Sequence, residues 1–187
     1  GNITGRETTT NHAQADYYIT EESSIPKVYG GFGTKLKVYG VDFGINFTYQ
    51  IGGKQYDGTY AYFMSSPYGT AGYNYHKDLL NSWTPENTNT NIPRFQMNDQ
   101  YSGAMSTRFL TNASFLNIQN INVGYTLPSK WTRKLVINSL RVYMSAENVF
   151  YWSKRKGFDP RQSYDETTNA TFYSPMRTIS GGVSFEF

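Results

Sequence analysis

The stretch from Asp42 to Ile51, DFGINFTYQI, alternates strictly between apolar and polar side chains. This period of two predicts a β-strand with one apolar and one polar face. At roughly 3.3 Å per residue and a tilt near 45°, about nine to eleven residues cross the hydrocarbon core of a bilayer. The stretch therefore has the length of a membrane-spanning strand. Its apolar face holds Phe43, Ile45, Phe47, Tyr49 and Ile51, and its polar face holds Asp42, Gly44, Asn46, Thr48 and Gln50.

Four further segments alternate in the same way: residues 31–38, 115–127, 140–147 and 178–187. The tight link Tyr39-Gly40-Val41 predicts that the first of them forms a hairpin with the quoted strand. In segment 115–127 the apolar residues fall on even positions up to Ile118 and on odd positions from Ile121. A bulge near Gln119-Asn120 would place both sets on the same face. Every charged residue within these strands lies on the polar side of the alternation. A charge that faces lipid near the midplane costs about 2–4 kcal/mol, so this strict exclusion favours a membrane barrel over a soluble sandwich. These charged residues are Lys35, Lys37, Asp42, Arg141, Glu147 and Glu186.

The composition agrees with strands that have one apolar and one wet face. Aromatic residues make up 17% of the 187 residues, including 17 Tyr and 12 Phe, yet the mean hydropathy is −0.59. A soluble sandwich or lectin shares this property, so composition alone does not separate the two. The net charge of +3 and the lack of a long basic run argue against nucleic-acid binding. The sequence contains no apolar stretch of about eighteen residues, so it predicts no transmembrane helix.

The links between the predicted strands differ greatly in length. The link at residues 39–41 is very short, that at 128–139 is moderate and carries one helical turn near residues 131–136, and those at 52–112 and 151–175 are long. Long loops on one side and short turns on the other are typical of outer-membrane barrels. Strand parity then places Phe187 at the periplasmic rim, makes residues 1–27 an extracellular loop segment and assigns residues 28–187 to strands and loops. Since no signal peptide precedes the strands, we expect a piece of a longer exported protein, interrupted within an extracellular loop.

No motif for catalysis, metal binding or a cofactor emerges. Asp42 and Glu147 are the only carboxylates near the middle of strands, and we interpret them as polar lumen lining rather than a glycosidase pair. His12 and His76 are far apart in sequence, which gives a metal site little support. The Tyr-rich segment 56–83 could stack against sugars, but no substrate-binding residue can be chosen from it. The sequence therefore predicts no catalytic or metal-binding residues, and it does not identify the substrate-binding residues.

One run resembles a known family. Residues 108–110 (RFL) and 115–128 (FLNIQNINVGYTLP) resemble the C-terminal signature of SusC/RagA-type TonB-dependent transporters. The resemblance extends from about Pro26 onward, and its specificity lies in the order and spacing of blocks that are each weak alone. These blocks are residues 49–54 (YQIGGK), 83–87 (WTPEN), 139–143 (SLRVY), 146–150 (AENVF), 156–160 (KGFDP) and 175–187 (PMRTISGGVSFEF).

The resemblance implies an all-β, transmembrane antiparallel barrel of 22 strands, of which about five lie in this chain. It implies that the plug domain and the TonB-interacting segment lie outside the chain. The expected function is import of oligosaccharides or oligopeptides across a Bacteroidota-type outer membrane, together with a SusD-like lipoprotein and without enzymatic chemistry. The alternative is an extracellular all-β carbohydrate-binding module or adhesin. Members of the family end in an aromatic residue, which implies an assembly signal at Val183, Phe185 and Phe187.

Overall fold

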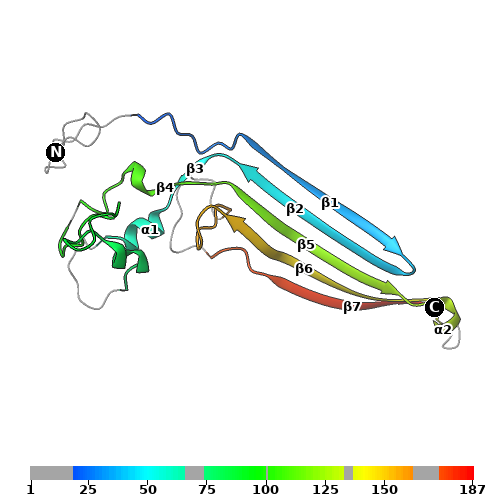
Figure 1. The fold of residues 1–187 in the computed structure, drawn as a ribbon. Helices are drawn as coiled ribbons and strands as arrows, with labels where there is room; N and C mark the ends of the chain where they lie inside the picture. The colour runs from blue at the N-terminus through cyan, green and yellow to red at the C-terminus, as the bar shows by residue number, and fades with distance from the viewer. Residues whose placement is uncertain (1–18, 66–73, 100, 133–136, 162–172) are drawn as a thin grey trace. The chain divides into compact units, whose positions relative to one another are not determined.

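The computed structural model describes residues 19–65, 74–99, 101–132, 137–161 and 173–187 (Figure 1). The chain divides into two compact units. The larger unit, Ser23–Tyr56 with Leu110–Phe187, contains a five-stranded sheet. The smaller unit, Gly1–Glu22 with Asp57–Phe109, contains short helices in its described part. Within the described ranges, no helix is long and apolar enough to cross a membrane.

The five-stranded sheet is a simple antiparallel meander (Figure 1). Its strands lie in the order β1-β2-β5-β6-β7, which is their order along the chain, and each pairs antiparallel with its neighbours. This confirms the predicted all-β, antiparallel fold class. All five strands are at least nine residues long, the length that a tilted strand needs to cross a bilayer core. They are β1 (Val28–Val38), β2 (Val41–Ile51), β5 (Phe115–Thr126), β6 (Ser139–Ser153) and β7 (Thr178–Glu186).

The turn between β1 and β2 has two residues, Tyr39 and Gly40, because Val38 pairs directly with Val41. Both turn residues have positive φ values, 50° for Tyr39 and 84° for Gly40. Two successive positive φ values match the type I′ turn, whose twist suits a two-residue hairpin. A Cβ on Gly40 would lie only 2.6 Å from the carbonyl oxygen of Thr126, so glycine fits the site for two reasons. The predicted hairpin is confirmed.

The predicted bulge in the third long strand is also confirmed. Asn46 of β2 pairs with Asn120 and the next residue, Phe47, pairs with Ile118, which leaves Gln119 as the extra residue. On the other side of β5 the register also shifts between Ile118 and Asn120. The extra residue keeps Ile118 on the same face as Ile121 although the two lie three positions apart. One face of the sheet therefore remains apolar along its whole length.

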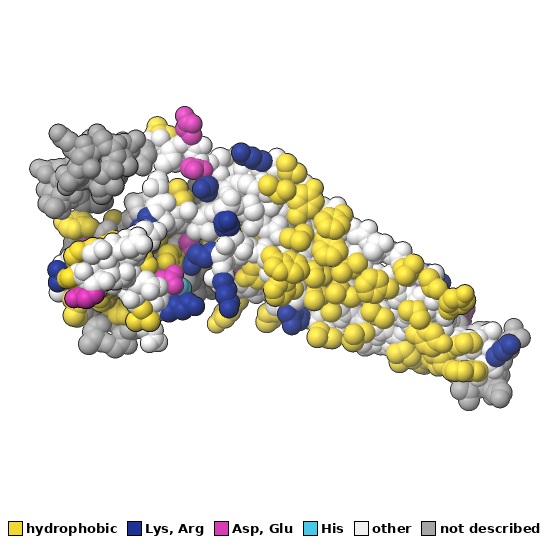
Figure 2. Space-filling view, in the orientation of Figure 1, with side chains coloured by type: hydrophobic (Ala, Val, Ile, Leu, Met, Phe, Trp, Pro, Cys, Tyr) yellow, Lys and Arg dark blue, Asp and Glu magenta, His cyan; other side chains and the backbone are white. Residues whose placement is uncertain are grey.

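The register aligns apolar residues into rows that cross all five strands. A continuous apolar surface covers one face of the sheet (Figure 2). Its side chains are exposed, with fractions of 60% for Leu36, 53% for Met144 and 57% for Val183. So large an exposed apolar surface requires an apolar environment outside this chain. Three of the rows are Thr34-Ile45-Ile121-Ala146-Ile179, Leu36-Phe43-Val123-Met144-Gly181 and Val38-Val41-Tyr125-Val142-Val183.

The links between strands hold more structure than the sequence predicts. The link after β2 contains β3 (Lys54–Tyr56), which pairs with β4 (Leu110–Asn112). Gly52 and Gly53, with φ values of 84° and 79°, let the chain turn from β2 into β3. Strand β6 continues to Ser153, so the following loop begins later than residue 151. Helix α2 (Ser129–Thr132) begins two residues before the predicted helical turn, whose residues 133–136 lie outside the described ranges.

The smaller unit is organised around Tyr60. Its helices are α1 (Gly58–Phe63), η2 (Lys77–Asn81) and η3 (Thr107–Phe109). The hydroxyl of Tyr60 donates to Oδ2 of Asp78 at 2.9 Å, and its ring packs edge-on against His76 at a centroid distance of 4.8 Å. Burial, reinforced by the hydrogen bond to Asp78, raises the pKa of Tyr60 to about 12. The phenol therefore stays protonated and acts as a structural hydrogen-bond donor at neutral pH.

Candidate functional site

The second face of the sheet carries the polar phase of every strand. All six strand charges that the sequence assigned to the polar phase occupy that phase of the observed register. Lys37 lies opposite Asp42, for example, and Glu147 lies opposite Asn120. Hydrogen bonds between side chains link strands on this face, at three levels along the sheet. The polar face is therefore the candidate functional surface.

The level nearest the β1–β2 turn holds an ion pair that spans three strands. Nε and Nη2 of Arg141 on β6 donate to Oδ1 and Oδ2 of Asp42 on β2, at 3.1 and 2.6 Å. Between them lies Gly124 of β5, where an added Cβ would approach the carboxylate oxygens to 2.6 Å. The guanidinium also lies 5.1 Å from the ring centroid of Tyr143. Such a bidentate pair holds both side chains in a fixed geometry.

The middle level is a set of three asparagines. Nδ2 of Asn46 donates to Oδ1 of Asn120 at 2.8 Å, and Nδ2 of Asn122 donates to the same oxygen at 3.3 Å. Gly33 lies opposite Asn46, and a Cβ there would come within 2.6 Å of the carbonyl oxygen of Ile45. That Cβ would also overlap Oδ1 of Asn46, so the lack of a side chain on Gly33 leaves room for the Asn46 amide.

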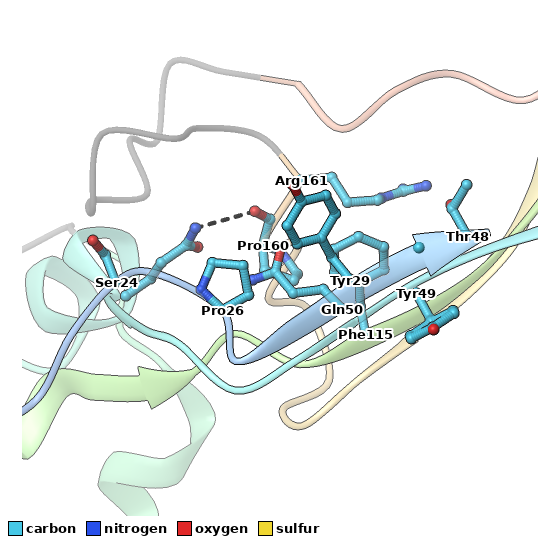
Figure 3. Close-up of a pocket in the computed structure, with 11 residues that line it drawn as sticks. Ser24, Pro26, Tyr29, Thr48, Tyr49, Gln50, Phe115, Pro160 and Arg161 are labelled. Atoms are coloured by element: carbon cyan, nitrogen blue, oxygen red, sulfur yellow. Dashed lines mark hydrogen bonds between the residues drawn. The ribbon is translucent and has the colours of Figure 1, made fainter.

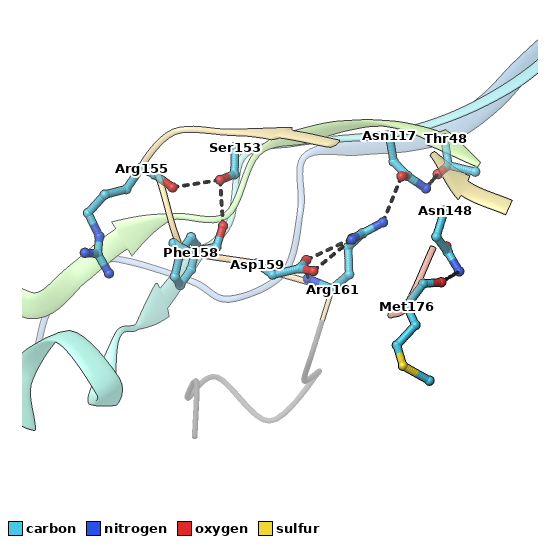
Figure 4. Close-up of polar contacts among 9 residues, drawn as sticks. All are labelled: Thr48, Asn117, Asn148, Ser153, Arg155, Phe158, Asp159, Arg161 and Met176. Carbon is cyan, nitrogen blue, oxygen red and sulfur yellow. Dashed lines mark hydrogen bonds and ion pairs between the residues drawn. The ribbon is translucent and has the colours of Figure 1, made fainter. Parts of the chain in front are cut away.

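The level at the opposite end of the sheet is built around Arg161 (Figure 4). Nε and Nη2 of Arg161 donate to Oδ1 and Oδ2 of Asp159, both at 2.8 Å, and Nη1 donates to Oδ1 of Asn117 at 2.8 Å. Nδ2 of Asn117 in turn donates to Oγ1 of Thr48 at 3.2 Å. The guanidinium lies 4.3 Å from the ring centroid of Tyr151. These contacts tie the turn after β6 to the polar face of β5 and β2.

Asp159 remains ionised in this cluster although it is buried. Its residue is 2% exposed, and burial raises the pKa of its carboxyl group. The hydrogen bonds and the positive charge of Arg161 outweigh that effect, so the pKa of Asp159 lies below its ordinary value. The turn itself is closed by Ser153, whose Oγ lies 2.6 Å from the carbonyl oxygen of Phe158. Arg161 is therefore presented by a rigid, charge-compensated support.

A pocket of about 610 Å³ adjoins Arg161 (Figure 3). Nε2 of Gln55 donates to the carbonyl oxygen of Pro160 at its wall, at 3.2 Å. Among the described residues, the lining combines aromatic rings and amides with one cation, Arg161, and no acidic side chain. Such a lining suits a neutral or anionic ligand that offers both apolar faces and hydrogen-bonding groups. The lining residues are Ser24, Pro26, Tyr29, Gly30, Thr48, Tyr49, Gln50, Gln55, Phe115, Pro160 and Arg161.

The two mid-strand carboxylates from the sequence are not brought together. Asp42 pairs with Arg141, and the β6 residue at its level of the sheet is Tyr143. Glu147 lies four residues further along β6, opposite Asn120. Both lie on the polar face, as the interpretation as lumen lining requires.

The histidines give no metal site in the described part of the chain. His76 contacts Asp78, with Nδ1 3.4 Å from Oδ2, while His12 lies outside the described residues. Within the described ranges, no group of three or more His, Asp or Glu side chains could hold a metal ion.

The three terminal residues named from the sequence lie on the apolar face. Val183 and Phe185 pair with Val142 and Leu140 of β6. The rings of Phe185 and Phe187 meet edge-on at a centroid distance of 5.5 Å. The structure thus aligns these side chains on one face, and their role in assembly stays a prediction.

The cluster around Arg161 is the part of the site that sequence reasoning missed. Asp159 and Arg161 lie in a segment read as a loop, where no alternation shows the direction of a side chain. The nearby block KGFDP was noticed only as part of a family resemblance. The sequence Asp159-Pro160-Arg161 carries no information about a strand some forty residues earlier. It therefore could not predict that Arg161 binds Asn117.

Comparison with known proteins places the chain among outer-membrane receptors. It is 25% identical over 167 residues to the TonB-dependent receptor P3 of Formosa agariphila, covering 84% of this chain and 16% of that receptor. It is 37% identical over 84 residues to the TonB-dependent receptor SusC of Bacteroides thetaiotaomicron, covering 44% of this chain and 8% of SusC. No protein-family model matches. The chain thus spans about one sixth of the curated relatives that it matches over most of its own length.

Solved structures agree. The RagAB peptide importer in its open-open state matches with a TM-score of 0.80 and 29% identity, over 100% of this chain and 20% of that chain. A structure of the RagAB peptide transporter matches with a TM-score of 0.73 and 30% identity, over 90% of this chain and 18% of that chain.

The fold and these relatives define a class, since the sheet is part of the β-barrel of a TonB-dependent outer-membrane receptor. Within that class, the chain corresponds to a C-terminal barrel portion of a receptor of the SusC/RagA type. These relatives are described as receptors and importers.

Proposed function

We propose that this chain forms part of the wall of an outer-membrane importer, with its apolar face toward lipid and its polar face toward the lumen. One observation carries the proposal: in the observed register, all six strand charges stay on one face, and the rows given above for the other face hold no charge and, apart from Thr34 and Gly181, only apolar side chains. A lipid-facing charge is costly near the midplane, whereas a lumen tolerates charges and asparagines. The large apolar exposure disfavours the alternative of an extracellular binding module or adhesin.

The proposal includes an orientation. The two-residue turn at Tyr39–Gly40 and the C-terminal end of β7 lie at the same end of the sheet, by the register of the strands. The links at the opposite end are the long ones. Because outer-membrane barrels have short periplasmic turns and longer extracellular loops, Phe187 would lie at the periplasmic rim. Residues 1–27 would then be an extracellular loop segment, and residues 28–187 the strands and loops of the barrel.

The proposed cargo is an oligosaccharide or an oligopeptide. Support for a peptide comes from solved relatives described as the RagAB peptide importer. The pocket beside Arg161, which opens on the polar face at the end of the sheet away from the Tyr39–Gly40 turn, suits either cargo. The proposed partners are a SusD-like lipoprotein, TonB acting through a part of the protein outside this chain, the remaining barrel and plug segments, and outer-membrane lipid. Nucleic acid is not among the proposed partners.

Membrane insertion tests the barrel. The full-length receptor should fractionate with outer membranes and migrate faster in detergent gels before heating than after, because a folded barrel is compact. A full-length protein that stays soluble without detergent would contradict the proposal and support the binding-module alternative.

Uptake tests the cargo. Cells that lack the receptor gene should lose uptake of one labelled class, oligopeptides or oligosaccharides, and regain it when the gene is restored. In restored cells, Tyr29→Ala, which removes an exposed ring from the pocket lining, should lower uptake of that class, while Lys35→Gln, on the same face but outside the pocket, should leave it unchanged. Equal uptake by both variants would argue against a role for the pocket.

A further inference from the structure

Asn117 is a buried asparagine on the polar face of β5, with 4% of its surface exposed. Both ends of its amide are hydrogen-bonded (Figure 4). Nδ2 donates to Oγ1 of Thr48 at 3.2 Å, and Oδ1 accepts from Nη1 of Arg161 at 2.8 Å. Thr48 and Arg161 both line the pocket, whereas Asn117 is not among the lining residues. Asn117 therefore contacts two residues of the pocket wall from outside the pocket.

The bulge at Gln119 decides that Asn117 faces this way. Beyond the bulge, the odd-numbered residues of β5 from Ile121 onward lie on the apolar face. Without the extra residue, strict alternation would place Asn117 on the apolar face as well. With it, Asn117 lies opposite Thr48 on β2 and Tyr151 on β6. The bulge thus directs a hydrogen-bonding side chain to the level of the sheet at which the pocket lies.

The turn that carries Pro160 and Arg161 into the pocket wall is held at both residues. Nε2 of Gln55 donates to the carbonyl oxygen of Pro160 at 3.2 Å, and Nη1 of Arg161 donates to Asn117. Nε and Nη2 of Arg161 donate to Asp159 of the same turn, so these two bonds do not tie the turn to the sheet. In the described part of the chain, the hydrogen bond to Asn117 is the one from Arg161 that reaches a strand of the five-stranded sheet.

We propose that Asn117 is a positioning residue for the pocket: its amide oxygen holds Arg161, and with it Pro160, in the place that cargo binding requires. The inference rests on the proposed function, because it takes the pocket to be a cargo site. Asn117 itself does not touch the cargo. A hydrogen bond from a guanidinium is strong and directional, so it fixes the height of the turn above the sheet. Because Pro160 directly precedes Arg161 and its ring fixes one backbone dihedral, the two residues move together.

Substitutions of similar size separate the hydrogen bonds of Asn117 from its packing. Asn117→Leu keeps the branched shape of the side chain and removes both hydrogen bonds. Asn117→Asp keeps an oxygen that accepts from Arg161. Asn120→Leu is the matched control, since Oδ1 of Asn120 accepts from two other asparagines on the same face, outside the pocket lining. If Asn117→Leu does not insert, Asn117→Ser, whose side chain is too short to reach Arg161, provides the same comparison.

Uptake kinetics in cells that carry the full-length receptor measure the effect. The probe is the labelled oligopeptide or oligosaccharide whose uptake the wild-type gene restores, and rates are divided by the amount of folded receptor in the outer membrane. Asn117→Leu should raise the half-saturating concentration about ten-fold, because a hydrogen bond to a charged group is lost, and leave the maximal rate per receptor unchanged. Asn117→Asp should return the half-saturating concentration to near the wild-type value, and Asn120→Leu should not change it.

A purely structural role gives a different result: Asn117→Leu would lower the amount of folded receptor and keep the wild-type half-saturating concentration. That outcome would overturn the positioning role, as would an equal rise in Asn117→Asp or in Asn120→Leu. Failure of the proposed function is distinguishable, because Tyr29→Ala, which removes an exposed ring from the pocket lining, would then leave uptake unchanged. A weaker apparent affinity in Tyr29→Ala but not in Asn117→Leu would refute only the positioning role.

Discussion

Arg141 and Asp42 bind one another across an intervening strand, with two hydrogen bonds of 3.1 and 2.6 Å over Gly124. The pair links β2 to β6 although neither strand contacts the other through its backbone. Since neighbouring strands lie about 4.8 Å apart, the two side chains together span roughly 10 Å. The pair thus fixes the register of three strands through contacts that no single hairpin provides.

Gly124→Ala should separate this ion pair and lower the temperature at which the folded barrel unfolds. The added Cβ would occupy space now taken by Nη2 of Arg141 and the carboxylate of Asp42. Heat-modifiable migration across a temperature series measures the effect. Gly181→Ala is the matched control, because the nearest atom to a Cβ there is the Tyr143 carbonyl oxygen at 3.6 Å. In an Asp42→Ala background, Gly124→Ala should cost less, since coupled sites are not additive; an equal cost in both backgrounds would exclude the pair as the cause.

The Asp159–Arg161 pair predicts a specific dependence on pH. Because the pKa of Asp159 is lowered in the folded state, its ionised form stabilises the fold above the ordinary value of 3.8. That stabilisation should be lost as the pH falls below 3.8 and through the lower folded pKa. Arg161→Gln would leave a buried carboxylate uncompensated and should cost about 3–5 kcal/mol near neutral pH. Unfolding midpoints from about pH 2 to pH 7 measure both effects. A variant Asp159→Asn that keeps the wild-type acid sensitivity would contradict the assignment.

Adjacent residues on β6 should respond oppositely to a new charge. Met144 lies in the apolar row and is 53% exposed, whereas Ser145 lies in the polar row opposite Asn122. Met144→Lys should destabilise the inserted barrel by about 2–4 kcal/mol, because it places a charge against lipid. Ser145→Lys places the same charge toward the lumen and should change stability little. Urea unfolding in vesicles compares the two, and equal losses would show that the faces are assigned incorrectly.

Deletion of Phe187 in the full-length receptor should reduce the amount of folded barrel in the outer membrane. The expected reason is loss of the last aromatic in a phase shared by Val183, Phe185 and Phe187. Outer-membrane fractionation with quantified heat-modifiable protein measures the yield. Phe187→Tyr should restore most of it, while Phe187→Ser should not. An unchanged yield after deletion would refute an assembly role for this residue.

Strand patterns in the sequence predicted most of the sheet. Period-two alternation identified all five long strands, and the phase change around Gln119 identified the bulge. The prediction failed where alternation is absent. The β3–β4 pair joins segments more than fifty residues apart, and each is only three residues long, too short to show a period. The end of β6 was missed because the irregularity around Asn148, with its φ of 50°, interrupts the pattern before Ser153.

By itself the sequence determined which side chains share a face, because alternation along an extended chain is a local property. It therefore predicted that Asp42 and Arg141 lie on the polar face and that Val183 and Phe185 lie on the apolar one. Only the tertiary structure decided which polar residues meet. The contacts of Asp42 with Arg141, and of Arg161 with Asn117, depend on the register between strands and on the path of a turn. Those follow from backbone pairing across distant segments, which no local pattern encodes.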